Sequence, residues 1–192
     1  GGNQIEGRAL EAAFRSFVGL EPIPIRHSLT LGEVCAWRMA EEKLSTEALG
    51  VVGFEGVAPD SLACEWDQPP VFPSPNMPTF DTMLVYPGGC LLEGTNLSDG
   101  RGTTRPFEIT GAPYVNGFQL AHDLNRSGLP GFIARPLTFR PTFHKHAGKE
   151  CGGVQIHVTD KRAFRPVATY TALIAYAHHQ APDSFRFRTE KY

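Results

Sequence analysis

Apolar residues recur at helical spacing in three stretches, which predicts helices within residues 27–44, 114–131 and 161–185. The first helix is expected to begin after Thr30, because Thr30 and Glu33 have the spacing of a capping box. In such a box each side chain accepts a hydrogen bond from the other residue's backbone amide. A shorter helix or turn is predicted to open at Thr79 and to stop at the Pro-Gly-Gly of residues 87–89.

Alternation of apolar and polar residues predicts strands. It is clearest over residues 152–160 and weaker over 132–143, whose prolines place that strand near a sheet edge. A short apolar run over 48–57 predicts a buried strand, and five prolines in 67–78 predict an extended crossing segment. Helices alternating with proline-broken strands indicate a mixed α/β (α+β) domain, in which helices flank a small mixed sheet.

Composition narrows the class of protein. With 41% hydrophobic and 20% charged residues, the chain can bury a core and is not of the disordered class. A net charge of −2 without a basic helix argues against nucleic-acid binding, and no apolar run approaches the roughly 18 residues of a membrane span. The four cysteines form no CxxC pair and are interpreted as small buried hydrophobes, with one disulfide left open for an exported protein.

Polar side chains and glycines crowd into residues 90–113, which read CLLEGTNLSDGRGTTRPFEITGAP. Glu93 lies where an apolar run meets a glycine loop, so its carboxylate would be partly desolvated yet reachable. Partial desolvation raises the pKa of a carboxyl group into the range that suits proton transfer. Glu93 is therefore the candidate catalytic residue, and the alternative is that it accepts backbone amides and caps the loop.

Two arginines of this stretch, Arg101 and Arg105, carry planar forks of donors that suit carboxylates and vicinal hydroxyls. The loop glycines would let the chain fold back on itself and bring these side chains to one rim. We therefore expect one pocket to be bordered by Glu93, Asn96, Arg101 and Arg105. The alternative is that the two arginines pair with Asp99 and Glu108 and only hold the loop.

Three histidines raise the question of a metal site. His144 and His146 would share one face if they lay on a strand, an arrangement that zinc sites use, and His157 follows nearby. Spacing fixes no third ligand, so neither a metal nor a cofactor is predicted. A metal-dependent hydrolase built on these three histidines is kept as an alternative. Residues 100–105 also lack the frame of a phosphate-binding loop.

Three segments resemble one protein family when they are taken in order. They are GLEPIPIRHSLTLGE, PSPNMPTFDTMLVYPGGCLLEGTNLSDGRGTTRPFEITGAP and PTFHKHAGKECGGVQIHVTD. They resemble the bacterial exo-β-N-acetylmuramidase (NamZ-like) family, formerly a domain of unknown function. The chain departs from the family pattern at Ser28, where a glycine is usual, and at Cys35 and Cys64.

The resemblance implies a glycosidase that removes terminal N-acetylmuramic acid from peptidoglycan fragments, in which a smaller α/β domain follows a Rossmann-like N-terminal domain. Residues 1–45 would be the tail end of the first domain and its connector, and residues 46–192 the second domain. Since the chain begins GGNQIEGRAL without Met, the larger part of the first domain is expected upstream. The fragment would contribute part of the cleft and be inactive alone.

The resemblance also assigns a substrate-binding set beside Glu93, made up of Asn76, Asn96, Arg101, Arg105, Glu108, Lys145 and His146. N-acetylmuramic acid differs from its partner sugar by a lactyl carboxylate, so a selective site needs an oriented cation, for which Arg101 and Arg105 are the candidates. The expected partner is a peptidoglycan-derived muropeptide or disaccharide. The oligomeric state, a homodimer included, stays open.

A periplasmic or secreted location follows from the substrate class, with cytoplasmic cell-wall recycling as the other option. The alternative function, from another class, is a non-catalytic carbohydrate-binding or domain-pairing module. Weak muropeptide binding by the isolated chain would favour a sugar site of its own.

Overall fold

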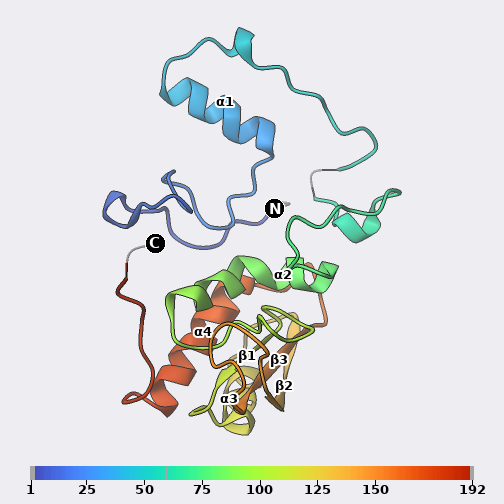
Figure 1. The fold of residues 1–192 in the computed structure, drawn as a ribbon. Helices are drawn as coiled ribbons and strands as arrows, with labels where there is room; N and C mark the ends of the chain where they lie inside the picture. The colour runs from blue at the N-terminus through green and yellow to red at the C-terminus, as the bar shows by residue number, and fades with distance from the viewer. Residues whose placement is uncertain (1–2, 59, 191–192) are drawn as a thin grey trace. The chain divides into compact units, whose positions relative to one another are not determined.

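The chain divides into two compact units, residues 1–71 and 72–192, in a computed structural model that describes residues 3–58 and 60–190 (Figure 1). The first unit is mostly irregular chain held by turns and short helices, whereas the second contains the sheet. The predicted domain boundary after residue 45 stays a prediction, and the compact units of this chain divide between Val71 and Phe72.

The first unit holds helix α1 (Leu31–Glu41) and three short 3-10 turns, η1 (Ala12–Phe14), η2 (Thr46–Ala48) and η3 (Ala63–Glu65). The predicted capping box is confirmed. The Thr30 amide donates to Glu33 Oε2 at 2.7 Å, and the Glu33 amide donates to Thr30 Oγ1 at 3.2 Å. The described part of the chain buries none of the residues of α1, so this helix depends on its own hydrogen bonds and cap.

The predicted strand over residues 48–57 is wrong. The segment is irregular, with a turn at its end, and Val52 is 98% exposed. A strand needs a neighbour to satisfy its backbone amides and carbonyls, and no described segment pairs with this one. The proline-rich segment 67–78 forms neither helix nor strand, as predicted, and contains a turn closed by the Met77 amide on the Ser74 carbonyl at 2.9 Å.

The interpretation of the cysteines as buried hydrophobes is correct only in part. Cys151 is buried and Cys90 is half-buried, whereas Cys35 and Cys64 are exposed. No disulfide joins any of the four. The two exposed cysteines both lie in the first unit.

The second unit is built from three helices and a three-stranded sheet, which confirms the mixed α/β class (Figure 1). The helices are α2 (Phe80–Gly89), which continues as the 3-10 helix η4 (Cys90–Gly94), α3 (Gly117–Asn125) and α4 (Pro166–Gln180). Helix α3 packs against the sheet and against α4, and α4 packs against α2. No helix among the described residues is long and apolar enough to cross a membrane.

The sheet has the order β1-β3-β2, and both pairings are antiparallel, so the small sheet is antiparallel and not mixed as predicted. The strands are β1 (Ile109–Ala112), β2 (Phe132–Phe139) and β3 (Cys151–Val158). The two strands predicted from alternation are confirmed, and β2 lies at an edge as its prolines predicted, because Pro136 has no amide to donate. Strand β1 was missed, since four residues are too few to show a period.

Helix α2 ends at Gly89, within the predicted Pro-Gly-Gly, but it passes through Pro87 and Gly88 instead of stopping before them. The packing of α2 against α4 explains why residue 88 is a glycine. A Cβ atom on Gly88 would lie 2.0 Å from the carbonyl oxygen of Pro166, far inside van der Waals contact. Glycine is thus required here for close helix approach, and the tertiary contact outweighs its poor helix propensity.

The core of the second unit is one cluster of buried apolar side chains from all three helices and the sheet. Tyr170 of α4 is fully buried within it and donates from its hydroxyl to the Phe107 carbonyl at 2.5 Å. Phe107 has a left-handed backbone conformation, with φ of 64°, and its ring contacts Tyr86 edge-on with the ring centroids 4.9 Å apart. The loop that carries the charged residues is therefore anchored to the core at Phe107.

Candidate functional site

Arg101 is the centre of a group of charged residues in the second unit. Two of its guanidinium nitrogens donate to Asp99 Oδ2 and to Glu93 Oε1, each at 2.7 Å. The guanidinium carbon lies 4.8 Å from the centroid of the Phe107 ring. Burial alone would lower the pKa of Arg101, but its bonds to Glu93 and Asp99 outweigh burial and raise that pKa. The chain's own carboxylates thus occupy the fork of Arg101.

Asp99 is the buried anion of this group, with 1% of its side chain exposed. The Arg101 amide donates to Asp99 Oδ1 at 3.2 Å, and Lys145 Nζ lies 3.8 Å from Asp99 Oδ2. Lys145 also donates to the Leu92 carbonyl at 2.8 Å. Burial lowers the pKa of Lys145, and the charge of Asp99 offsets part of that effect. We call Glu93, Asp99, Arg101 and Lys145 the charge cluster.

Backbone contacts at Gly102 join the loop that carries Asp99 and Arg101 to the loop that carries Lys145. Gly102 has a φ of 83°, and a Cβ atom there would lie 2.7 Å from the backbone nitrogen of Phe143. The Thr142 amide and hydroxyl both donate to the Gly102 carbonyl, at 2.9 and 3.0 Å. Close backbone contact at this glycine therefore holds Lys145 near the carboxylates of the 93–101 loop.

His144 and His146 lie in a turn rather than on a strand. His144 and His146 have left-handed backbones, with φ of 70° and 59°, in the connection between β2 and β3. His144 Nδ1 is 3.6 Å from Asp99 Oδ1, whereas His146 Nε2 is 2.7 Å from the carbonyl oxygen of Asn96. His157 lies on β3. Among residues 3–58 and 60–190, no three His, Cys, Asp or Glu side chains are grouped to hold a metal ion.

Glu108 and Arg105 form a second, looser pair. Glu108 is buried and accepts hydrogen bonds from Thr82 Oγ1 at 2.6 Å and Thr79 Oγ1 at 3.2 Å, which tie the start of α2 to the residue before β1. Arg105 Nη1 is 3.8 Å from Glu108 Oε1, and 42% of the Arg105 side chain is exposed. In contrast to Arg101, Arg105 therefore lies beyond hydrogen-bond distance of its carboxylate.

Asn96 holds the end of the chain in place. Its Oδ1 accepts from the Tyr114 hydroxyl at 2.5 Å and from the Arg186 amide at 2.9 Å, and its Nδ2 donates to the Ser184 carbonyl at 2.9 Å. A β-bridge between Thr95 and Phe187 continues this pairing. Burial above all raises the pKa of Tyr114 to about 12. The contacts with Ser184 and Arg186 join residues 88 and 90 apart, so no local pattern could have predicted them.

The predicted site residues therefore fall into separate groups, held by hydrogen bonds or ion pairs. Glu93, Arg101 and Lys145 come together, His146 bonds Asn96, and Arg105 pairs with Glu108. Asn76 lies in the turn before α2, where its amide donates to Ser74 Oγ at 3.2 Å. Their roles in substrate binding, and the single pocket expected for Glu93, Asn96, Arg101 and Arg105, stay predictions. Sequence analysis missed Asp99 as the buried anion that organises the charge cluster.

Alkaline pH should destabilise the second unit through Cys90. Burial, and then the charge of Glu93, raises the pKa of the Cys90 thiol from 9.0 to about 11. The unfolded chain would lose this proton near pH 9 while the folded chain keeps it, so the free energy of unfolding falls between pH 9 and 11. After allowance for partial solvent access we expect a loss on the order of 1–2 kcal/mol.

Chemical denaturation at pH 8 and about pH 11 measures this loss. A Cys90→Ala variant should lose less stability over that interval than the parent chain, whereas a Cys35→Ala variant, which removes an exposed thiol, should follow the parent. Equal losses in all three chains would contradict the assignment to Cys90.

Comparison with known proteins finds similarity to one protein family along nearly the whole chain. The family model for the N-terminal part of exo-β-N-acetylmuramidase NamZ matches residues 1–81, and the model for its C-terminal part matches residues 84–192. A protein of Bacillus subtilis (strain 168) named peptidoglycan β-N-acetylmuramidase NamZ is 44% identical over 187 residues. That match covers 97% of this chain and 45% of the relative.

Two crystal structures of DUF1343 family proteins from Bacteroides fragilis share the fold. The first has a TM-score of 0.84 at 30% identity, and the alignment covers 95% of this chain and 48% of that one. The second has a TM-score of 0.68 at 27% identity, with coverages of 96% and 49%. The chain thus spans about half the length of the relatives it matches.

Proposed function

Because the chain belongs to the exo-β-N-acetylmuramidase NamZ family, we propose that it supplies part of the substrate site of a glycosidase. The glycosidase would remove terminal N-acetylmuramic acid from peptidoglycan fragments, as the name of the Bacillus subtilis relative indicates for that protein. The proposal includes a periplasmic or secreted location. The Rossmann-like fold of the first domain stays an expectation from the family.

The observation that carries the proposal is a carboxylate held by an arginine at the edge of the charge cluster. Glu93 and Arg101 are each 21% exposed, so the pair is reachable by solvent although it lies beside buried Asp99. Glycoside hydrolysis generally uses two carboxyl groups. Glu93 Oε1 accepts from Arg101 Nη2 at 2.7 Å, and Glu93 is the carboxyl group that we assign to this chain.

The proposal can be tested with a chimera. In this chimera, the chain replaces the matched 45% of the Bacillus subtilis relative. We expect it to release N-acetylmuramic acid from a muropeptide disaccharide at a rate within about tenfold of that relative, and the 192-residue chain alone to release none. A folded but inactive chimera, beside an active parent, would count against the proposal. Circular dichroism of both proteins establishes that the chimera is folded.

Arg105 is the residue we assign to the lactyl carboxylate. The fork of Arg101 is filled by two carboxylates at 2.7 Å, whereas Arg105 is 42% exposed and lies 3.8 Å from its partner, Glu108. Replacing Arg105 with Lys keeps the charge and loses the planar fork. We expect the preference of the chimera for muramic over glucosamine termini, measured as the ratio of kcat/KM, to fall by about 5- to 50-fold.

Arg140 offers a matched control, since it is 65% exposed and also lies 3.8 Å from a carboxylate, that of Glu150. Arg140→Lys should leave the preference unchanged. If Arg105→Lys keeps the full preference too, then Arg105 belongs to the scaffold and selectivity resides elsewhere in the protein.

A further inference from the structure

Residues 184–188, which follow α4 and read SFRFR, alternate aromatic and arginine side chains. Such alternation is typical of extended chain, in which every second side chain lies on one face. Phe187 indeed pairs with Thr95 of the second unit in an antiparallel β-bridge. We call residues 184–188 the strap.

The strap pairs with the residues that directly follow Glu93. The Arg188 amide donates to the Gly94 carbonyl at 2.9 Å. The Asn96 amide donates to the Arg186 carbonyl at 3.0 Å, and the Arg186 amide donates in return to Asn96 Oδ1 at 2.9 Å. These bonds fix the backbone that continues from Glu93, and they come from the opposite end of the second unit's sequence.

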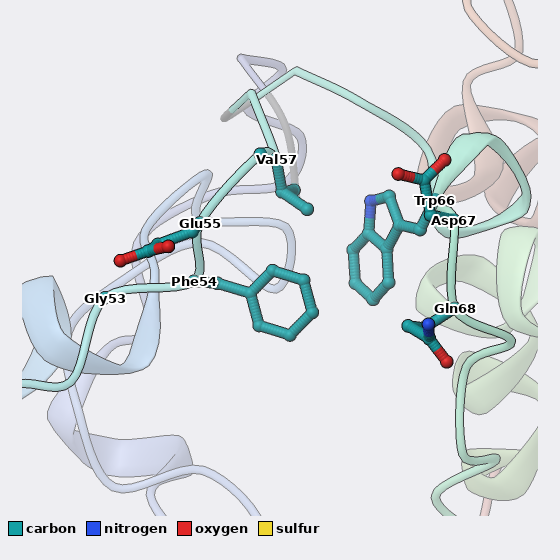
Figure 2. Close-up of a pocket in the computed structure, with 8 residues that line it drawn as sticks. Gly53, Phe54, Glu55, Val57, Trp66, Asp67 and Gln68 are labelled. Carbon is teal, nitrogen blue, oxygen red and sulfur yellow. The ribbon is translucent and has the colours of Figure 1, made fainter.

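Two aromatic contacts fix the strap to α4. The buried Phe185 ring meets the His178 ring of α4 edge-on, with centroids 5.3 Å apart, and Phe187 meets Phe185 edge-on at 5.0 Å. The first unit also has an exposed ring pair, Phe54 and Trp66, but those rings belong to two short irregular stretches that border one cavity (Figure 2). The rings of the strap differ, because they connect a long helix to the loop that carries the carboxylates.

The same pairing reaches the lysine of the charge cluster. The carbonyl oxygen of Asn96 lies 2.7 Å from His146 Nε2, and the neighbouring Lys145 donates to the Leu92 carbonyl at 2.8 Å. Burial chiefly lowers the pKa of Lys145, and the charge of Arg188 lowers it further. The strap is therefore close enough to the charge cluster for its own charge to act there.

We propose that the strap positions Glu93, by holding the backbone of residues 94–96 so that the carboxylate keeps one place beside Arg101. The catalytic use of that carboxylate rests on the proposed function, whereas the holding of the loop does not. A displacement of about 1 Å in a reacting group can cost about 100-fold in rate. Arg186, Phe187 and Arg188 are thus positioning residues, which act through the 93–101 loop.

A proline at residue 188 tests the proposal, because proline has no amide to donate to Gly94. In the 192-residue chain, we expect Arg188→Pro to speed amide hydrogen exchange in residues 94–101 by about fivefold or more. Exchange in β3 and α3 should stay within about twofold of the parent. Mass spectrometry of peptic fragments measures both. Thr189→Pro is the matched control, since Thr189 is exposed and no described residue accepts from its amide.

Phe187→Ala is a second variant that leaves every backbone amide in place. Phe187 is 64% exposed, so its loss removes the contact with Phe185 without opening the core. Exchange in residues 94–101 should again rise, by about twofold or more. Phe118→Ala removes a ring of α3 that is 79% exposed and should leave that exchange at the parent rate.

The chimera measures what positioning does for the reaction. Arg188→Pro should lower its kcat by about tenfold or more and change KM by less than about threefold, because the strap acts on Glu93 and not on substrate binding. Rates are normalised to the folded fraction, measured by circular dichroism. Thr189→Pro should leave both constants within about twofold of the parent chimera.

Three results would overturn the inference. They are unchanged exchange in residues 94–101 in both strap variants, an equal rise in β3 and α3, and faster loop exchange with an unchanged kcat in an active chimera. Because hydrogen exchange needs no activity, its outcome is independent of the proposed function. An inactive parent chimera with a responsive loop would reject the proposed function and keep the strap as the element that holds the loop.

Discussion

Replacing Asp99 with Ala is expected to lower the free energy of unfolding of residues 72–192 by about 3 kcal/mol. Asp99 is the buried partner of Arg101 at 2.7 Å and lies 3.8 Å from Lys145 Nζ. Removal of one member of a buried ion pair leaves an uncompensated charge, which typically costs about 3–5 kcal/mol. We place the loss at the lower limit because Arg101 and Lys145 are 21% and 17% exposed and retain some hydration.

Urea denaturation followed by circular dichroism measures this loss. Asp99→Asn should destabilise the unit less than Asp99→Ala, since the amide oxygen can still accept from the Arg101 backbone. Asp183→Ala removes an exposed carboxylate and should change the free energy of unfolding by less than about 0.5 kcal/mol. A loss for Asp99→Ala no greater than that of Asp183→Ala would show that the charge cluster does not stabilise the fold.

Periodicity predicted the elements that depend on local sequence. The capping box of Thr30 and Glu33 set the start of α1, and alternation over 152–160 identified the central strand. The failures have a common cause, since each depends on a partner distant in sequence. Gly88 stays helical because the carbonyl of Pro166 packs against it, and residues 48–57 form no strand because no described segment pairs with them.

At the candidate site, too, local contacts could be predicted from the sequence and long-range contacts could not. The pairing of Arg101 with Asp99, two residues away, was foreseen as an alternative to ligand binding. The contact of Lys145 with Leu92 spans 53 residues, and that of Asn96 with Ser184 spans 88. Long-range contacts of this kind depend on how the loops pack in three dimensions. The sequence therefore indicated which residue types gather, and the fold determines which donors remain for a ligand.

Glu93 could serve either chemistry or structure, and a substitution separates the two roles. Glu93→Gln keeps the size of the side chain and an oxygen that accepts from Arg101, but it removes the charge and the ability to take a proton. If Glu93 is a general base, kcat of the chimera should fall by about 10²- to 10⁴-fold. The free energy of unfolding should change by less than about 1.5 kcal/mol, the net value of one hydrogen bond.

The opposite pattern would assign Glu93 to the scaffold. An activity within about threefold of the parent chimera, together with a clear loss of stability, would mean that Glu93 serves to hold Arg101, as Asp99 does from the other side. Glu93→Asp is the companion variant, because it keeps the charge and withdraws the carboxylate by one methylene from Arg101. A base that must reach its substrate loses activity on that change, since proton transfer requires hydrogen-bond contact. A purely structural partner would lose stability instead, so the two readouts together determine whether this chain brings a catalytic carboxylate to the enzyme.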